Sequence, residues 1–332
     1  MGKRRIVSGF DPLELQDAYG ALDKLYQTFP YEDAKEDGRE DLEGGIQTLL
    51  GMMRERLESS QSLPFSSLTM ERLRNLNISR VGSLELKTGT TLDEQVKKVQ
   101  AVGKDDIWSS DNLYRHLERL QMIIPKSNEA AARAWIDAFF FRVSATIPPE
   151  ESMVLIKELP IKPTAVKPSG STKLHGNIDY TAAVVPKKTA GAIRSDPSID
   201  HLRAIMSSGL VVTEAKSFST SLRDHIPQAV AEMYGCAKAL KKDVIRGALT
   251  SGDKWMFFVL VINDNGDGAK YWQSVELSFL SRLGTRATIE APWPDIVAGI
   301  LAHWTRNGFQ TLRMVTIGSM LTPGVVVVNK SQ

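Results

Sequence analysis

The segment Leu-Val-Val-Thr-Glu-Ala-Lys, residues 210–216, decides the fold class of this chain. Its β-branched and aliphatic residues are typical of a strand. Side chains along a strand alternate between the two faces of a sheet, so Glu214 and Lys216 should project to one side and Ala215 to the other. The segment therefore predicts a strand that presents a carboxylate and an amine as neighbours.

A second acidic residue lies in a similar run upstream. Residues 174–185 are rich in Ile, Val, Thr and Tyr, end at Pro186 and contain Asn177-Ile178-Asp179-Tyr180. This composition predicts another strand. If the two strands are adjacent in the sheet, Asp179 lies beside Glu214, and two carboxylates and a lysine share one wall.

This combination suits phosphodiester hydrolysis. Carboxylate oxygens, the Ala215 carbonyl and retained waters match Mg²⁺ better than a soft metal such as zinc, and Mn²⁺ would also serve. A bound metal acts as a Lewis acid on phosphoryl oxygens and generates an attacking hydroxide near neutral pH. Lys216 would orient that water and stabilise charge on the phosphate. The residues leave an alternative open, in which Glu214 and Lys216 form a surface ion pair of little consequence.

The flanking segments predict the elements around these strands. Asn128 is expected to cap a helix that runs to about Val143, and Pro227 fits the first turn of a second helix. The predicted order is helix, strand, strand, strand, helix, strand. The first strand spans residues 153–159, the second helix ends at 240, and the last strand spans 255–262. Residues 264–268, Asp-Asn-Gly-Asp-Gly, favour a hairpin turn over a calcium loop. The prolines of residues 160–170 predict a break or a long loop, Trp293-Pro294 leads a predicted helix over 295–307, and residues 312–328 contain strand-like runs. His175, four residues before Asp179, is expected to be a surface or hydrogen-bonded group and not a ligand.

With this order and these acids, the chain resembles the PD-(D/E)XK nuclease superfamily from roughly Ser127 to Phe279. The resemblance implies an α/β fold with a restriction-endonuclease-like core, in which helices flank a mixed central sheet. By position it implies the following roles: Asp179 and Glu214 are metal ligands, Lys216 is the catalytic base or a water-orienting cation, Glu129 is an auxiliary acid, and Gln228 is a helper on the second helix.

A looser resemblance joins the chain to uncharacterised fungal nuclease-like proteins, some of which occur as Crinkler-type effector domains. It is carried by the phrases Asn128-Glu129-Ala130, Ile178-Asp179-Tyr180, Glu214-Ala215-Lys216, Gln228-Ala229 and residues 250–258. Two departures stand out. Ile178 replaces the proline of the superfamily's name, and Glu232 occupies the position where nucleases of the RecB type have a tyrosine, four residues after the helix glutamine.

Composition sets the remaining expectations. A chain of 332 residues, 42% hydrophobic and 24% charged, can bury a substantial core as one large domain or two. We expect a mainly helical N-terminal region over residues 1–121 and the nuclease-like catalytic domain over 122–332. The single cysteine, Cys236, is expected to be a small buried residue. It fits a reducing compartment, and the absence of a long apolar run or an apolar leader predicts an intracellular protein with no membrane partner.

The charge distribution points to nucleic acid. Residues 151–250 carry 14 Lys and Arg against 9 Asp and Glu, although the whole chain has a net charge of only +2. A basic surface around the carboxylates would hold phosphates without reading sequence. The predicted function is therefore a Mg²⁺-dependent endonuclease, with DNA as the expected substrate and a homodimer compatible with it. The alternative that stays open is a non-catalytic nucleic-acid or protein-binding module on the same scaffold, deployed as an effector.

Overall fold

The computed structural model describes residues 12–28, 44–53, 61–166, 172–206, 209–283, 286–310 and 320–323. Within them the strands are β1 (Gln61–Pro64), β2 (Ile78–Leu86), β3 (Glu151–Ala165), β4 (Thr172–Pro186), β5 (Gly209–Ala215), β6 (Val244–Thr250), β7 (Lys254–Ile262), β8 (Ala269–Ser274), β9 (Leu277–Ser278), β10 (Leu280–Leu283), β11 (Arg286–Ile289) and β12 (Leu321–Pro323). The helices are α1 (Pro12–Thr28), α3 (Met70–Asn75), α4 (Thr90–Ala101), α5 (Ser110–Ile123), α6 (Glu129–Ser144), α7 (Lys187–Ser195), α8 (Ile199–Ile205), α9 (Ile226–Leu240) and α10 (Trp293–Asn307), with 3-10 turns η2 (Phe65–Ser67) and η3 (Leu222–His225). Residues 44–53 are also helical.

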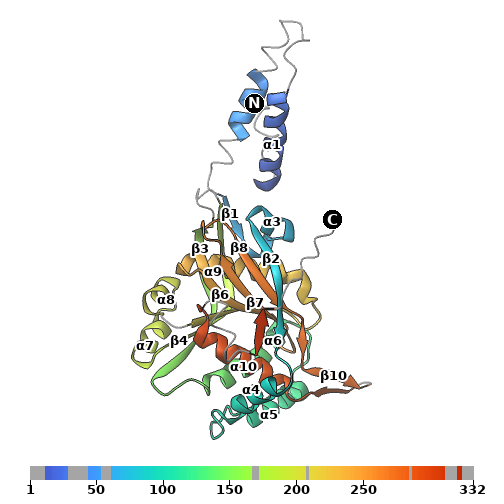
Figure 1. Cartoon of the computed structure of the whole chain (residues 1–332), viewed down its shortest axis with the longest axis vertical. Coiled ribbons are helices and arrows are strands. Elements are labelled where there is room, and N and C mark those ends of the chain that lie inside the picture. Colours follow the sequence, from blue (N-terminus) through green and yellow to red (C-terminus); the bar gives the residue numbers. More distant parts are fainter. Residues whose placement is uncertain are drawn as a thin grey trace.

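A ten-stranded mixed sheet dominates the described part of the chain (Figure 1). Its strand order is β1-β4-β5-β6-β7-β8-β2-β12, with β3 paired to β4 and β9 to β7. The β1–β4, β5–β6 and β2–β8 pairs are parallel, and the other pairs are antiparallel. The predicted class, an α/β fold with helices flanking a mixed central sheet, is therefore confirmed.

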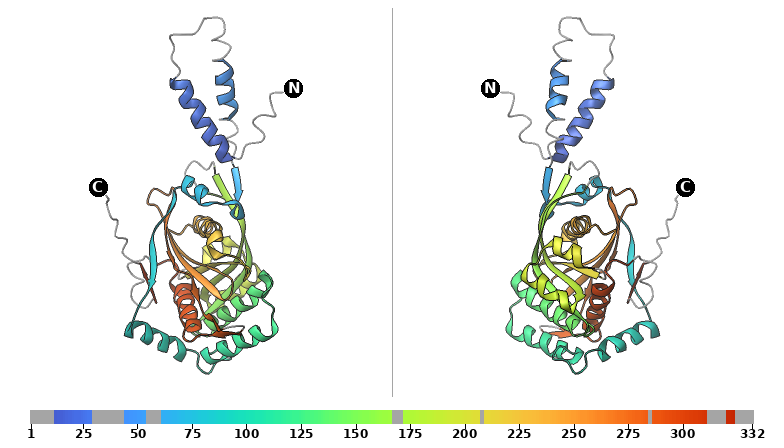
Figure 2. Two further views of the ribbon diagram at one scale, coloured as in Figure 1. Left: turned by 90° about the vertical axis from the view of Figure 1, so that its right-hand side faces the viewer. Right: turned by 90° about the vertical axis from the view of Figure 1, so that its left-hand side faces the viewer.

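Helices cover both faces of this sheet (Figure 2). One core lies between the sheet and α9 and includes buried residues of α3, α7 and α8. The other lies between the sheet and α6 and α10, with α4 and α5 packed outside them. In β5, Leu210 and Val212 belong to the α9 core, and Val211 and Ala215 to the α6 core. The alternation predicted for this strand is confirmed, and it places Glu214 on the α9 face.

One strand of the core was missed. Residues 244–250 form β6, which follows α9 and runs parallel to β5, so it takes the position that the sequence had assigned to residues 255–262. The latter residues form the next strand, β7. Arg246 and Gly247 interrupt the apolar run, and for this reason the sequence pattern did not predict β6. Arg246 is nevertheless fully buried, because its guanidinium donates to the backbone carbonyls of Asn307, Gly308 and Gln310.

The strand β3 is longer than predicted. Residues 160–170 were expected to form a break or loop because of their prolines, but β3 continues to Ala165. It pairs only with β4, and an edge strand tolerates prolines because one side needs no ladder partner. The pairing register shifts between Ile161 and Thr164, next to Pro163.

The predicted boundary at residue 121 does not coincide with a break in the sheet. β1 and β2 lie before it, pair with β4 and β8, and supply buried residues such as Leu63 and Ile78 to the α9 core. Between them, the Phe65 ring packs beside Gly176 of β4 and Gly235 of α9; a Cβ added to these glycines would lie 2.7 and 2.6 Å from it. Residues 61–121 thus belong structurally to the same sheet and cores as the rest.

The helical prediction for the earliest residues is confirmed where the structure describes them. α1 and the helix over 44–53 pack together around Met53, with Ala18, Tyr19, Leu22 and Leu49 beside it. At the other end, α10 was predicted by Trp293-Pro294. The strand-like runs expected over 312–328 fall mostly outside the described residues, except for β12, which pairs with β2. None of the described helices combines the length and apolar character needed to cross a bilayer.

Candidate active site and metal centre

Asp179 and Glu214 lie at the end of the ladder between two neighbouring strands. β4 and β5 are antiparallel, with Tyr180 opposite Thr213 as the last ladder pair. Asp179 and Glu214 each lie one residue beyond this pair, and they are close enough that the charge of Asp179 raises the pKa of Glu214. A direct contact fixes the Asp179 side chain here, because the Ala215 backbone N–H donates to its Oδ2 at 2.8 Å.

Glu214 lies at the centre of a buried polar cluster. Its side chain is 3% exposed, and Lys216 Nζ lies 2.6 Å from its Oε1. Gln228, in the first turns of α9, donates through Nε2 to the same oxygen at 2.6 Å. The structure therefore brings the predicted residues Asp179, Glu214, Lys216 and Gln228 together, and the backbone of Ala215 with them.

Glu232 joins this cluster although no site role was predicted for it. It is fully buried one turn after Gln228 on α9, and Gln228 Nε2 also donates to its Oε1 at 3.0 Å. Its Oε2 has no hydrogen-bond partner among the described residues. The usable sequence signal was the i, i+4 spacing from Gln228, which places two side chains on one helix face.

The remaining predicted residue, Glu129, is linked to the cluster by an arginine. Arg133 of α6 contacts three carboxylates: Nη2 lies 3.0 Å from Glu129 Oε1 and 2.7 Å from Asp179 Oδ1, and Nη1 lies 2.7 Å from Glu158 Oε1. α6 begins where predicted, because Asn128 Oδ1 accepts the Ala131 N–H. Arg133 and Glu158 were not predicted, since contacts between a helix and an edge strand leave no periodic signal in sequence.

Glu158 is in an unusual backbone conformation. Its φ is +54°, in the left-handed region, and it is skipped in the β3–β4 ladder between Lys157 and Leu159. For a residue with a Cβ this conformation costs about 1 kcal/mol or more. The Glu158 carboxylate contacts Arg133, so β3 contributes one further acid to the same group of charges.

Burial and mutual repulsion raise the pKa values of the innermost acids. Burial, followed by the charge of Asp179, raises the pKa of Glu214 above its usual range. The pKa of Glu232 is also raised, by burial and by the charge of Glu214. Burial alone would lower the pKa of Lys216, but the Glu214 carboxylate outweighs it and the pKa is raised. Lys216 therefore stays charged.

Acidic side chains outnumber basic ones in this part of the structure. The carboxyl groups of Asp179, Glu214, Glu129 and Glu158 face the two cations Arg133 and Lys216. An excess of carboxyl groups over cations suits a site for a metal ion.

The donor types fit Mg²⁺, although cationic side chains already contact some of the donor oxygens. Mg²⁺ takes one or two carboxylates and completes its shell with water and substrate oxygens. Asp179, Glu214 and the Ala215 carbonyl supply this set. Arg133 and Lys216 already occupy one oxygen of each carboxylate, and within the described residues no three His, Cys, Asp or Glu side chains are arranged to hold an ion together.

Other residues considered in the sequence lie elsewhere or play structural parts. His175 is four residues from Asp179 along β4, and its Nδ1 lies 2.8 Å from Ser62 Oγ of β1. Cys236 is fully buried in α9, as predicted, and burial raises the pKa of its thiol. The hairpin predicted at residues 264–268 is confirmed between the antiparallel strands β7 and β8.

Comparison with known proteins adds no further evidence for this site. No protein-family model matches the chain, and no curated protein matches its sequence.

Proposed function

We propose that this protein is a Mg²⁺-dependent nuclease with a restriction-endonuclease-like core. The observation that carries the proposal is that Asp179 meets the end of β5, where the Ala215 N–H donates to its Oδ2 at 2.8 Å and Lys216 Nζ lies 2.6 Å from Glu214. Carboxylates on adjacent strands and a charged lysine beside them are the groups that metal-assisted phosphodiester hydrolysis requires.

The order of elements supports the same proposal. α6, β3, β4, β5, α9 and β6 follow one another as helix, three strands, helix and strand, with α7 and α8 inserted before β5. β5 and β6 are parallel and joined by α9. This is the order implied by the resemblance to PD-(D/E)XK nucleases, with β6 in the place of the last core strand.

The residues would divide the chemistry among them. Asp179, Glu214 and the Ala215 carbonyl would hold Mg²⁺, which supplies Lewis acidity toward the phosphoryl oxygens and lowers the pKa of the attacking water. Because its pKa is raised, Lys216 fits the role of a cation that orients water and phosphate better than that of a base. Gln228 fixes the Glu214 carboxylate from α9, and Arg133 ties Glu129 and Glu158 to Asp179.

Nucleic acid, with DNA as the first expectation, is the proposed substrate. The excess of Lys and Arg over residues 151–250 supports binding to a phosphate backbone without sequence readout.

A second candidate is a binding module that retains the scaffold without catalysis. The observation in its favour is that Arg133 and Lys216 already neutralise one oxygen of each proposed ligand. In a non-catalytic module these ion pairs would be permanent, and the cluster would serve stability alone.

A cleavage panel separates the two candidates. Purified protein is incubated with supercoiled plasmid, single-stranded DNA and RNA, each with Mg²⁺, Mn²⁺ or a chelator. We expect cleavage that depends on the metal and that falls about 100-fold or more in Asp179→Asn and in Lys216→Met, because each removes a ligand or a transition-state cation.

Asp200→Asn and Lys188→Met are matched controls, because they make the same changes on the exposed surface of α8 and α7. Circular dichroism of all four variants checks the fold. Cleavage at the wild-type rate in both site variants, or no cleavage of any substrate under any metal condition, would overturn the proposal.

A further inference from the structure

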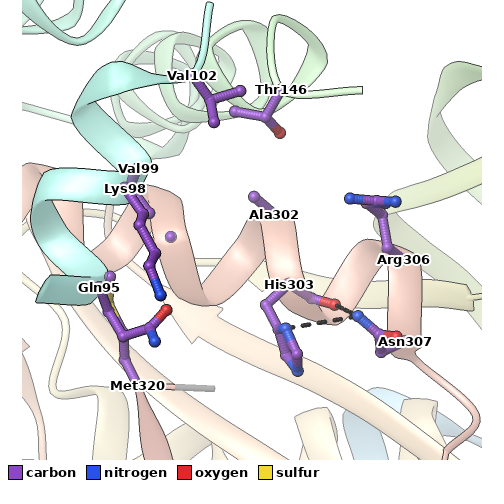
Figure 3. A pocket seen from close by; sticks show the side chains of 11 residues that line it. Gln95, Lys98, Val99, Val102, Thr146, Ala302, His303, Arg306, Asn307 and Met320 are labelled. Atoms are coloured by element: carbon purple, nitrogen blue, oxygen red, sulfur yellow. Dashed lines mark hydrogen bonds between the residues drawn. The ribbon is translucent and has the colours of Figure 1, made fainter. Parts of the chain in front are cut away.

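A cavity of about 170 Å³ lies between α4 and α10 (Figure 3). Gln95 and Lys98 of α4 border it on one side, and His303 and Arg306 of α10 on another, as Figure 3 shows. Its volume equals that of about six waters in the liquid, which suits a small molecule.

This cavity is distant from the candidate active site along the sheet. The C-terminal part of α10 meets the first residue of β5: a Cβ added to Gly209 would lie 2.4 Å from the Thr305 carbonyl oxygen. Glu214 and Lys216 lie at the other end of β5. The cavity and the acidic cluster therefore lie near opposite ends of β5.

The charged side chains in the described lining are the cations Lys98 and Arg306, with no carboxylate among them. Lys98 is exposed, and none of the described residues forms an ion pair with it. Arg306 is also exposed and has one long contact, from Nε to Glu151 Oε2 at 3.9 Å, so both terminal nitrogens of its guanidinium are left for another acceptor. Two cations with unused donors thus border one small cavity.

His303 adds a neutral side chain to this lining. Burial, then the cations Arg246, Lys87 and Arg306, lower the pKa of His303 to about 4, so the imidazole is uncharged at neutral pH. Asn307 Nδ2 donates to the His303 carbonyl at 2.8 Å and lies 3.5 Å from Nδ1. His303 Nε2 is buried and has no hydrogen-bond partner among the described residues.

Part of the lining is apolar. Val99, Val102, Ala302 and Met320 contribute side chains there, and Gly299 contributes none, while Gln95, Thr146 and Asn307 are neutral and polar. A Cβ on Gly299 would lie 2.6 Å from Met320 Cε and 2.8 Å from Val99 Cγ2, so glycine is required for α4, α10 and Met320 to meet at this depth. The cavity combines an apolar floor with a positively charged rim.

We propose that this cavity binds a small organic anion, a carboxylate or phosphate monoester with a short apolar body, through Lys98 and Arg306. The charged group would lie between these two side chains, and the apolar body would lie against Val99, Ala302 and Met320. Charge-assisted hydrogen bonds to Lys and Arg are the stronger class of hydrogen bond and give such a site its preference for anions.

Isothermal titration calorimetry with three probes of similar size tests this site. Benzoate and phenyl phosphate carry the two head groups, and benzyl alcohol lacks the charge. We expect saturable binding of at least one anion and none of the alcohol, with affinity reduced about tenfold in Lys98→Met and in Arg306→Met. Lys97→Met is the matched control, since Lys97 is equally exposed on α4 but does not line this cavity.

A second readout does not depend on affinity. In a ¹⁵N-labelled protein, anion binding should shift the side-chain resonances of His303 and leave those of His201 on α8 unchanged. Equal binding of the alcohol, unchanged affinity in both rim variants, loss of affinity in Lys97→Met, or absence of binding by both anions would each overturn the proposal. The relative affinity of the two anions distinguishes a carboxylate ligand from a phosphate ligand.

Discussion

Arg133 is the side chain on which most of the acidic cluster converges. Among the residues that the structure describes, it alone contacts carboxylates from three elements, namely Glu129 of α6, Glu158 of β3 and Asp179 of β4. Its own side chain is 24% exposed, so water screens these contacts only in part. Removing this cation leaves three acids close together without compensation.

We therefore expect Arg133→Met to lower the free energy of unfolding by about 2 kcal/mol in the absence of metal, less than a fully buried ion pair would lose. Mg²⁺ should restore more stability to the variant than to the wild type, because the ion replaces the missing positive charge. Urea denaturation with and without Mg²⁺ measures both effects. Arg194→Met, on the exposed surface of α7, is the control; equal Mg²⁺ effects on wild type and Arg133→Met would contradict the proposed competition between Arg133 and metal.

His303 makes stability depend on pH in a definite direction. Its pKa falls from 6.5 in the unfolded chain to about 4 in the folded protein. Below pH 6.5 the unfolded chain therefore binds a proton at His303 and the folded protein does not. The free energy of unfolding falls with the pH until about pH 4, where His303 of the folded protein is protonated as well. We expect this residue to cost about 2 kcal/mol between pH 7 and pH 4, after allowance for its partial exposure.

Urea denaturation of wild type and His303→Gln at pH 8, 5.5 and 4.5 checks this expectation. The difference in stability between the two proteins at pH 8 serves as the reference, because His303 is neutral there in both states. The stability of the variant should change less with acidification than that of wild type. Parallel curves for the two proteins would count against the lowered pKa.

How far sequence could predict the site depended on the kind of contact. Asp179, Glu214 and Lys216 were found because strand alternation and one assumed strand pairing fix their relative positions. Arg133 and Glu158 were out of reach, since their meeting depends on how α6 crosses the edge of the sheet and on one left-handed residue.

At the scale of single elements, the C-terminus of α9 shows a local conflict between sequence and conformation. Lys241 caps this helix with φ +55° and ψ +47°, a left-handed conformation that most helices give to glycine or asparagine at this position. The Lys241 side chain is exposed and its backbone N–H donates to Ala237 and Lys238 carbonyls. Only the Cβ is unfavourable there.

Lys241→Gly should therefore stabilise the protein by about 1 kcal/mol, which differs in sign from most glycine substitutions. Lys242→Gly is the control, because the next residue does not have a positive φ and should gain nothing from glycine. Thermal or urea denaturation of the two variants beside wild type gives the comparison. A loss of stability in Lys241→Gly would show that the cap does not hold the strain assigned to it.

The elements also show where periodicity fails as a signal. β5, β7 and α10 were found because their apolar patterns are uninterrupted or regular. β6 was missed because buried Arg246 looks like a surface residue in sequence, although its charge is matched by three backbone carbonyls in the structure. Pro160 and Pro163 suggested a break because sequence does not reveal that β3 is an edge strand.

At the scale of the whole molecule, the structure assigns residues 61–121 to the central body. β1 and β2 pair with strands from the second half of the chain, and Leu113, Leu117 and Leu120 of α5 are buried against α6 and its neighbours. α1 and the helix over 44–53, by contrast, form a small cluster of their own.

Two truncations test this division. We expect residues 61–332 to unfold cooperatively, with a melting temperature within about 4 °C of the full chain, since few core contacts are lost. A fragment beginning at residue 122 should lack a cooperative transition, because removal of β1, β2, α4 and α5 uncovers both cores. Differential scanning calorimetry compares the two. Cooperative melting of the shorter fragment would instead support a separate domain that begins near residue 122, as the sequence predicted.

The position of Phe65 between Gly176 and Gly235 has a consequence for biosynthesis. Phe65 leaves the ribosome long before the glycines that receive its ring, and Asn77 donates to the Asp267 carbonyl 190 positions later. Bringing such distant residues together costs a large amount of chain entropy before any stabilising contact forms. We therefore expect this segment to dock late in folding. Until α9 has been synthesised, the nascent chain lacks one of the two glycines that receive the Phe65 ring, so this part of the core is completed only after Gly235 has been added.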